Sequence, residues 1–124
     1  MAFNFEKLGV YQKAIEFIDQ VYSQTSGYPK EEMFGLTSQF RKAAVSISLN
    51  IAEGSARTRK DFNRFLDMAR GSVFEFVAIL QISEKRKYIT HLGFNELRDR
   101  LVGISKMLSG LKRSLAPQTM NNEQ

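Results

Sequence analysis

The chain has 124 residues, of which 43% are hydrophobic and 25% are charged, so it is long enough for one packed domain and too apolar for a disordered chain. It has no cysteine and a single histidine, which excludes a disulfide framework, a thiolate metal site and any site that needs two histidines. The formal net charge is +5, and the excess of Lys and Arg falls after residue 35, a distribution that favours polyanionic or acidic partners.

The first helix is predicted over residues 8–25. Its apolar residues recur at helical spacing, so they would lie on one face: Val10, Ala14, Phe17, Ile18 and Val21. Gly27 and Pro29 follow at positions where these two residue types commonly end a helix.

Residues 29–35 are predicted to form a connector with one helical turn, followed by a second helix over residues 37–55. Thr37 is the expected N-cap, because a threonine hydroxyl can accept hydrogen bonds from the free N–H groups of a first turn. The core stripe of this helix is Phe40, Ala43, Ala44, Ile47 and Ile51.

The third helix is predicted to begin after an N-cap at Thr58 and to end near Lys87, with Asp61 placed as in a capping box. Its core stripe is Phe62, Phe65, Leu66, Ala69, Val73, Phe76, Val77 and Leu80. The basic triplet at its end is Lys85, Arg86 and Lys87. This triplet either complements the helix dipole or forms a binding surface.

The fourth helix is predicted to follow an N-cap at Thr90, with Ile89 and Phe94 placed as a hydrophobic staple. Its apolar repeat is Leu97, Leu101, Ile104, Leu108, Leu111 and Leu115. Four helices with short connections predict an all-α fold, an antiparallel up-and-down four-helix bundle. We expect a single domain over residues 1–116 and a flexible polar tail over residues 117–124.

The core stripes leave a second apolar face on the middle two helices. On ideal helical wheels, these residues point away from the core: Val45, Leu49, Ala52, Ala56, Phe74, Ala78 and Ile82. Either the buried face is broad enough to absorb them within the monomer, or they form an oligomer interface, since soluble monomers seldom expose large apolar patches. We expect the second, a homo-oligomer.

A basic cluster brackets the junction between the second and third helices: Arg57, Arg59, Lys60 and Arg64. Arg59 and Lys60 fall in a first helical turn, where the helix dipole disfavours cations, and this conflict indicates a use outside the helix. The cluster lacks interleaved aromatic residues, so contact with phosphates is favoured over base stacking. A solvated surface without a partner is the alternative.

The sequence shows no catalytic apparatus, so we expect no enzyme activity, no cofactor and no metal. His91 is predicted to be a surface residue in a first helical turn. Asn50, Glu53, Arg70 and Glu75 are expected to form a structural polar network between the second and third helices, in which Arg70 pairs with one of the glutamates. A catalytic role for Glu53 or Glu75 is the less favoured alternative.

The N-terminal residues show no secretory signal, and no segment approaches the run of about 18 apolar residues that a membrane span needs. We therefore expect a cytoplasmic protein without a membrane partner.

Four segments carry a family resemblance: residues 10–14 (VYQKA), 35–44 (GLTSQFRKAA), 46–54 (SISLNIAEG) and 65–72 (FLDMARGS). They resemble the four-helix-bundle proteins encoded in intervening sequences of bacterial 23S ribosomal RNA genes. The fourth helix matches only as a leucine-patterned amphipath, and Leu49 stands where many relatives have proline or a small-to-medium residue.

The resemblance implies an antiparallel bundle that assembles into a ring, commonly a pentamer. The family is also similar to the accessory protein of diversity-generating retroelements, a basic barrel that engages nucleic acid and a reverse transcriptase. Four residues match basic positions of the family pattern: Arg41, Lys42, Arg57 and Arg70.

The leading hypothesis is a non-enzymatic homo-oligomer that binds RNA or DNA through basic surface residues. The candidate nucleic-acid-binding residues are Arg41, Lys42, Arg57, Arg59, Lys60 and Arg64. The alternative is an interaction scaffold whose positive face meets an acidic protein partner. The resemblance separately implies a reverse transcriptase as a protein partner.

Overall fold

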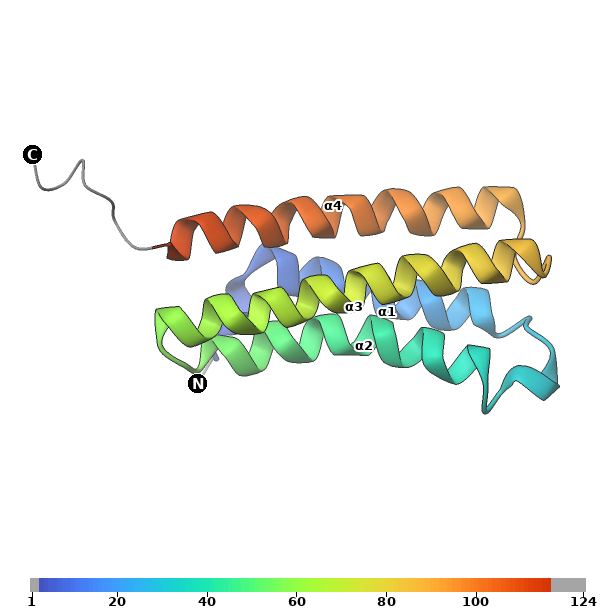
Figure 1. Ribbon diagram of the computed structural model, residues 1–124, viewed down its shortest axis with the longest axis horizontal. Helices are drawn as coiled ribbons and strands as arrows, with labels where there is room; N and C mark the ends of the chain where they lie inside the picture. Colours follow the sequence, from blue (N-terminus) through green and yellow to red (C-terminus); the bar gives the residue numbers. More distant parts are fainter. Residues whose placement is uncertain (1–2, 117–124) are drawn as a thin grey trace, which may run out of the picture.

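The computed structural model describes residues 3–116, and this part of the chain folds as four helices without strands (Figure 1). The helices are α1 (Gly9–Thr25), α2 (Leu36–Ser55), α3 (Arg59–Lys85) and α4 (His91–Leu115), with short 3-10 turns η1 (Asn4–Lys7) and η2 (Lys30–Glu32). Each helix packs on the next, α4 closes the bundle against α1, and α2 and α3 share the most extensive contact. The predicted four-helix bundle is confirmed.

The core forms where the apolar stripes of the four helices meet, and its centre is aromatic. The Phe76 ring lies 4.3 Å from the Phe40 ring and 4.9 Å from the Phe17 ring, measured between centroids. The predicted stripes are buried with few exceptions, since Ile18, Val77, Leu111 and Leu115 are only partly buried. The structure adds Tyr28, Ile79 and Ile89 to the buried set.

The start of α2 differs from the prediction that Thr37 caps it. The helix begins one residue earlier, and the carboxylate of Glu32, in η2, accepts a hydrogen bond from the Leu36 N–H at 3.1 Å. Thr37 instead lies inside the first turn, buried, and its hydroxyl has no hydrogen-bond partner within residues 3–116. The prediction was wrong because a glutamate from the connector supplies the acceptor.

The two other predicted caps are confirmed. The Thr58 hydroxyl accepts from the Asp61 N–H at 3.2 Å, and the Thr90 hydroxyl accepts from the Gly93 N–H at 3.0 Å. Such bonds satisfy N–H groups that have no partner within the helix.

The C-terminus of α3 lies at Lys85, two residues before the predicted end. Lys87 has a φ of 64°, the left-handed conformation that glycine adopts more readily than other residues. The Lys87 N–H donates to the Glu84 carbonyl, and the Tyr88 N–H donates to the Ser83 carbonyl. These bonds form a Schellman motif, which ends the helix although no glycine is present.

A close approach between α2 and α3 depends on Gly54. A Cβ atom at this position would lie 2.6 Å from the Phe65 Cβ and 2.9 Å from the Phe62 Cδ1. Glycine therefore lets the last turn of α2 pack directly against the first turns of α3. This contact holds the junction that carries the basic cluster.

Candidate nucleic-acid interface

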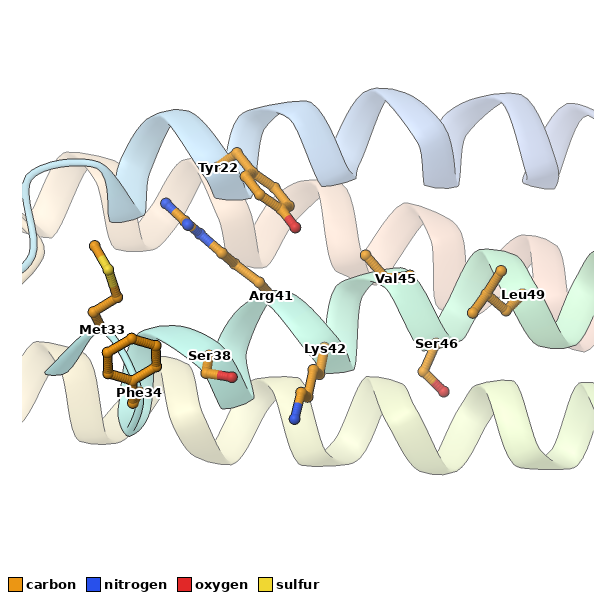
Figure 2. A pocket seen from close by; sticks show the side chains of 9 residues that line it. All are labelled: Tyr22, Met33, Phe34, Ser38, Arg41, Lys42, Val45, Ser46 and Leu49. Atoms are coloured by element: carbon orange, nitrogen blue, oxygen red, sulfur yellow. The ribbon is translucent and has the colours of Figure 1, made fainter.

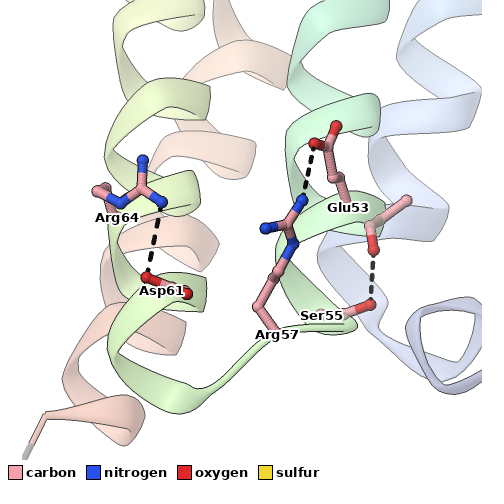
Figure 3. A network of polar contacts seen from close by, with 6 residues as sticks. Glu53, Ser55, Arg57, Asp61 and Arg64 are labelled. Carbon is pink, nitrogen blue, oxygen red and sulfur yellow. Dashed lines mark hydrogen bonds and ion pairs between the residues drawn. The ribbon is translucent and has the colours of Figure 1, made fainter.

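The predicted basic cluster lies at one end of the bundle, on both sides of the turn from α2 to α3 (Figure 3). The Arg57 guanidinium pairs with Glu53 at 3.5 Å, and the Arg64 guanidinium pairs with Asp61 at 3.6 Å. Both guanidinium groups also lie over the Phe65 ring, at 5.1 and 5.2 Å from its centroid. The ring and the two carboxylates therefore hold the arginines at the surface, where both stay exposed.

Arg59 and Lys60 belong to the first turn of α3 and behave differently. The Arg59 guanidinium donates to the Ser114 carbonyl at 2.7 Å, so it reaches the last turn of α4. Lys60 is exposed and forms no ion pair within the described part of the chain.

The end of α4 adds cations that the sequence interpretation did not include. Lys112 lies 2.7 Å from a carboxylate oxygen of Asp67, and the Asn63 amide donates to the Lys112 carbonyl. Arg113 is the next residue and is exposed. An up-and-down bundle places the last turn of the fourth helix beside the start of the third. The predicted topology therefore already indicated that Lys112 and Arg113 lie near the basic cluster. We call Arg57, Arg59, Lys60, Arg64, Lys112 and Arg113 the basic end.

Arg41 and Lys42 do not join this surface within the chain. They lie in the second turn of α2, about 24 Å along the helix axis from Arg57 at 1.5 Å per residue. The Arg41 Nε donates to the Thr25 hydroxyl at 2.9 Å, and its guanidinium lies 4.4 Å from the centroid of the Tyr22 ring. Arg41 therefore ties α2 to α1, whereas Lys42 is exposed.

A groove of about 520 Å³ runs along the outer side of α2, and we call it the α2 groove (Figure 2). Its lining residues are Tyr22, Met33, Phe34, Ser38, Arg41, Lys42, Val45, Ser46 and Leu49. Phe34 is 94% exposed, which is unusual for a phenylalanine. The lining combines apolar side chains with two cations and contains no carboxylate.

The predicted outer apolar faces of α2 and α3 are confirmed as surface for their largest members. Leu49 is 59% exposed, Phe74 is 69% exposed and Ile82 is 49% exposed, so a broad buried face within the monomer does not absorb them. Ala56 and Ala78 are also exposed, whereas Val45 and Ala52 are half-buried.

The predicted polar network does not form within the described residues. Arg70 approaches Asp67 on its own helix at 4.0 Å, and Glu53 pairs with Arg57. The Asn50 amide donates to the Ser46 carbonyl, and Glu75 is exposed on the outer side of α3. The prediction was wrong because each group finds a partner one helical turn away or faces solvent.

Two serine hydroxyls make the polar contact between α2 and α3 instead. The Ser72 hydroxyl donates to the Ser46 hydroxyl at 2.8 Å. The Asn50 amide also reaches the Ser46 hydroxyl, at 3.1 Å. Small side chains of this kind suit the close packing of the two helices.

The remaining chemical candidates lie on the surface. His91 is exposed, and its Nδ1 lies 3.2 Å from a carboxylate oxygen of Glu84. Residues 3–116 contain no group of three or more His, Cys, Asp or Glu side chains that could hold a metal ion. Among the same residues, no helix combines the length and the apolar character that a membrane crossing requires.

The family model described as 23S rRNA-intervening sequence protein matches residues 6–110. The chain belongs to this family. The family match covers α1, α2, α3 and most of α4, and it includes both the α2 groove and the turn between α2 and α3. It ends just before Lys112 and Arg113, so these two cations of the basic end lie outside the matched residues.

A solved structure supports the fold of this family member. The chain is similar to a crystal structure of a protein of unknown function from the S23 ribosomal protein family of Bacteroides thetaiotaomicron. The TM-score is 0.77 at 23% sequence identity, over 84% of this chain and 95% of the other. A comparison with curated proteins gave no match.

Proposed function

We propose that this family member is a non-enzymatic homo-oligomer that binds RNA or DNA through the basic end of its bundle. The observation that carries the proposal is the convergence of cations from three helix termini on one end. Arg57 follows α2, Arg59, Lys60 and Arg64 begin α3, and Lys112 and Arg113 end α4.

The arrangement suits contact with phosphates rather than with base edges. Arg57, Arg64 and Lys60 are exposed cations, and their carboxylate neighbours Glu53 and Asp61 are exposed or only half-buried. Exposed ion pairs contribute little energy, so a polyanion can displace them at small cost. Binding of this kind releases counterions and weakens steeply as the salt concentration rises.

Assembly would multiply this surface. Burial of a side chain such as Leu49, Phe74 or Ile82 contributes about 1.5–3 kcal/mol, so several together can hold an oligomer. In a cyclic assembly, every copy presents the same surface to the same side, and the basic ends would then repeat around one rim. The ring, and the pentamer in particular, is what the family resemblance implies.

Fluorescence anisotropy with labelled RNA and DNA oligonucleotides, repeated over a salt series, tests the proposal. We expect the logarithm of the binding constant to fall linearly with the logarithm of the salt concentration. No detectable binding at low salt, or binding that does not respond to salt, would contradict it.

Charge reversal locates the binding surface. The triple variant Arg57→Glu, Lys60→Glu, Arg64→Glu, which leaves the bond from Arg59 to Ser114 intact, should lose most of the affinity and flatten the salt dependence. The matched control reverses Lys85, Arg86 and Lys87, which lie at the opposite end of α3 and change the net charge equally. Equal losses in both variants would contradict the assignment to the basic end.

The alternative is that the basic end binds a protein partner, such as the reverse transcriptase that the resemblance implies. A pulldown treated with nuclease separates the two hypotheses. Partners that disappear with nuclease support nucleic-acid binding, and partners that survive nuclease and depend on the same arginines support the scaffold.

A further inference from the structure

Two exposed apolar surfaces of the bundle lie on neighbouring helices, α2 and α3. One is the α2 groove, which is concave and whose most exposed apolar residues are Phe34 and Leu49. The other lies on the outer face of α3, where Phe74 and Ile82 project into solvent. We call Phe74, Glu75, Ala78 and Ile82 the α3 ridge.

The α2 groove is long enough to hold the α3 ridge. From Ser38 to Leu49 the α2 groove follows the helix for about 16 Å, and from Phe74 to Ile82 the α3 ridge extends for about 12 Å, at 1.5 Å per residue. An apolar helix face laid into an apolar groove is a recurring mode of recognition.

Small residues on α3 favour a close approach. Ala78 lies between Phe74 and Ile82 along the helix, and Gly71 lies about one helical turn before Phe74. A Cβ atom at Gly71 would meet no atom within 4 Å, so the backbone is open to a neighbour there.

The two surfaces offer one complementary pair of charges, although Lys85 and Arg86 also lie beside Ile82. Lys42 lies in the α2 groove, whose lining contains no carboxylate, and Glu75 lies on the α3 ridge. Both side chains are exposed, and neither forms an ion pair with another residue of the described range 3–116.

We propose that the α3 ridge of one copy docks into the α2 groove of a second copy, with Glu75 facing Lys42. This inference rests on the self-association in the proposed function and names the surfaces that carry it. Because the two surfaces differ, the contact is heterologous, and repetition closes a ring or extends a filament. Lys42, which the sequence places among the nucleic-acid-binding residues, then belongs to the subunit interface.

Mixing of two variants tests the heterologous contact. Leu49→Asp damages only the groove, and Phe74→Asp damages only the ridge. Because both positions are exposed, each variant should keep the helical circular-dichroism spectrum of the wild type. Each variant alone should sediment as a monomer of 14.2 kDa. The mixture should form a dimer, because one intact groove and one intact ridge remain.

A dimer in either single variant, or no dimer in the mixture, would overturn the inference. If the wild type itself is a monomer, self-association fails and the inference fails with it. If the wild type is an oligomer that both variants leave intact, only the choice of surfaces is wrong. These outcomes are independent of the nucleic-acid titration.

Charge exchange tests the ionic contact. Lys42→Glu and Glu75→Lys should each raise the dissociation constant of the assembly about tenfold, and the double variant should restore it. Lys106→Glu, on an exposed position of α4, is the control and should change nothing. If the double variant does not restore the dissociation constant, the pairing of Lys42 with Glu75 is wrong. The pairing is also wrong if Lys42→Glu keeps the mass of the wild-type assembly but loses affinity for RNA, because the groove would then bind nucleic acid.

Discussion

The guanidinium of Arg59 donates a hydrogen bond to the carbonyl oxygen of Ser114 at 2.7 Å and so joins the first turn of α3 to the last turn of α4. A cation at a helix N-terminus is unfavourable, and this contact resolves the conflict, because the carbonyl groups at a helix C-terminus carry partial negative charge. Arg59 therefore has a structural role within the basic end. The bond also fixes the end of α4, with Lys112 and Arg113, beside the junction.

Arg59→Ala should therefore lower the free energy of unfolding by about 1 kcal/mol, because a charge-assisted hydrogen bond across the bundle is lost. Urea denaturation followed by circular dichroism measures the change. Lys60→Ala, one residue later and without an ion pair within residues 3–116, is the matched control and should leave the midpoint unchanged. If Arg59→Ala and Lys60→Ala change the free energy of unfolding equally, Arg59 has no structural role of this kind.

Lys87→Gly should raise stability. The backbone φ of 64° at this position is strained for a side chain with a Cβ atom and relaxed for glycine. We expect a gain of about 1 kcal/mol, reduced by the greater freedom of glycine in the unfolded chain. Lys85→Gly, inside the last turn of α3, should instead destabilise the protein. A loss of stability in Lys87→Gly would contradict the left-handed cap.

Gly54→Ala should destabilise the protein by about 1–3 kcal/mol, since the added methyl group collides with Phe65 and forces α2 away from α3. Thermal unfolding is the measurement. Gly103→Ala is the control, because a Cβ atom there meets nothing within 4 Å and alanine favours the interior of α4. A neutral Gly54→Ala would show that the two helices can separate without cost.

Tyr28 should make stability depend on pH in the alkaline range. Burial raises the pKa of Tyr28 above its ordinary value of 10.0, so the folded state holds the phenolic proton more tightly than the unfolded state. Its contribution is therefore complete below about pH 10 and falls as the pH rises further. Urea midpoints between pH 8 and 11 should fall less steeply for Tyr28→Phe than for the wild type. Identical slopes would contradict the burial of this hydroxyl.

Much of the fold could be predicted because local signals agreed with the tertiary structure. Thr58 and Thr90 precede amphipathic runs and act as N-caps, as their spacing indicates. Thr37 also precedes an amphipathic run, but the prediction that it is an N-cap was wrong. The Glu32 carboxylate, from the connector, accepts the hydrogen bond from the first turn of α2 instead. The left-handed Lys87 gave no signal, because the residue type that usually marks such a cap is glycine.

The candidate site was less predictable, since its geometry depends on contacts between distant segments. The basic cluster at the start of α3 was visible as a run of charges. Its contact with the end of α4, through the hydrogen bond from Arg59 to Ser114, could be seen only once the register of α3 against α4 was known. Phe34 lies in a connector, where helical periodicity assigns no face, so its exposure went unseen. Arg70 illustrates the converse, because helical spacing already places Asp67 one turn away on the same helix, whereas the prediction paired Arg70 with Glu53 or Glu75.

Sedimentation velocity of dilute protein with a fluorescently labelled RNA, at low and at high salt, tests the central claim most directly. The account predicts that the protein sediments as a multiple of the 14.2 kDa chain and carries the RNA with it at low salt, and that high salt frees the RNA while the oligomer persists. A folded monomer of 14.2 kDa that leaves the RNA unbound at low salt would contradict it.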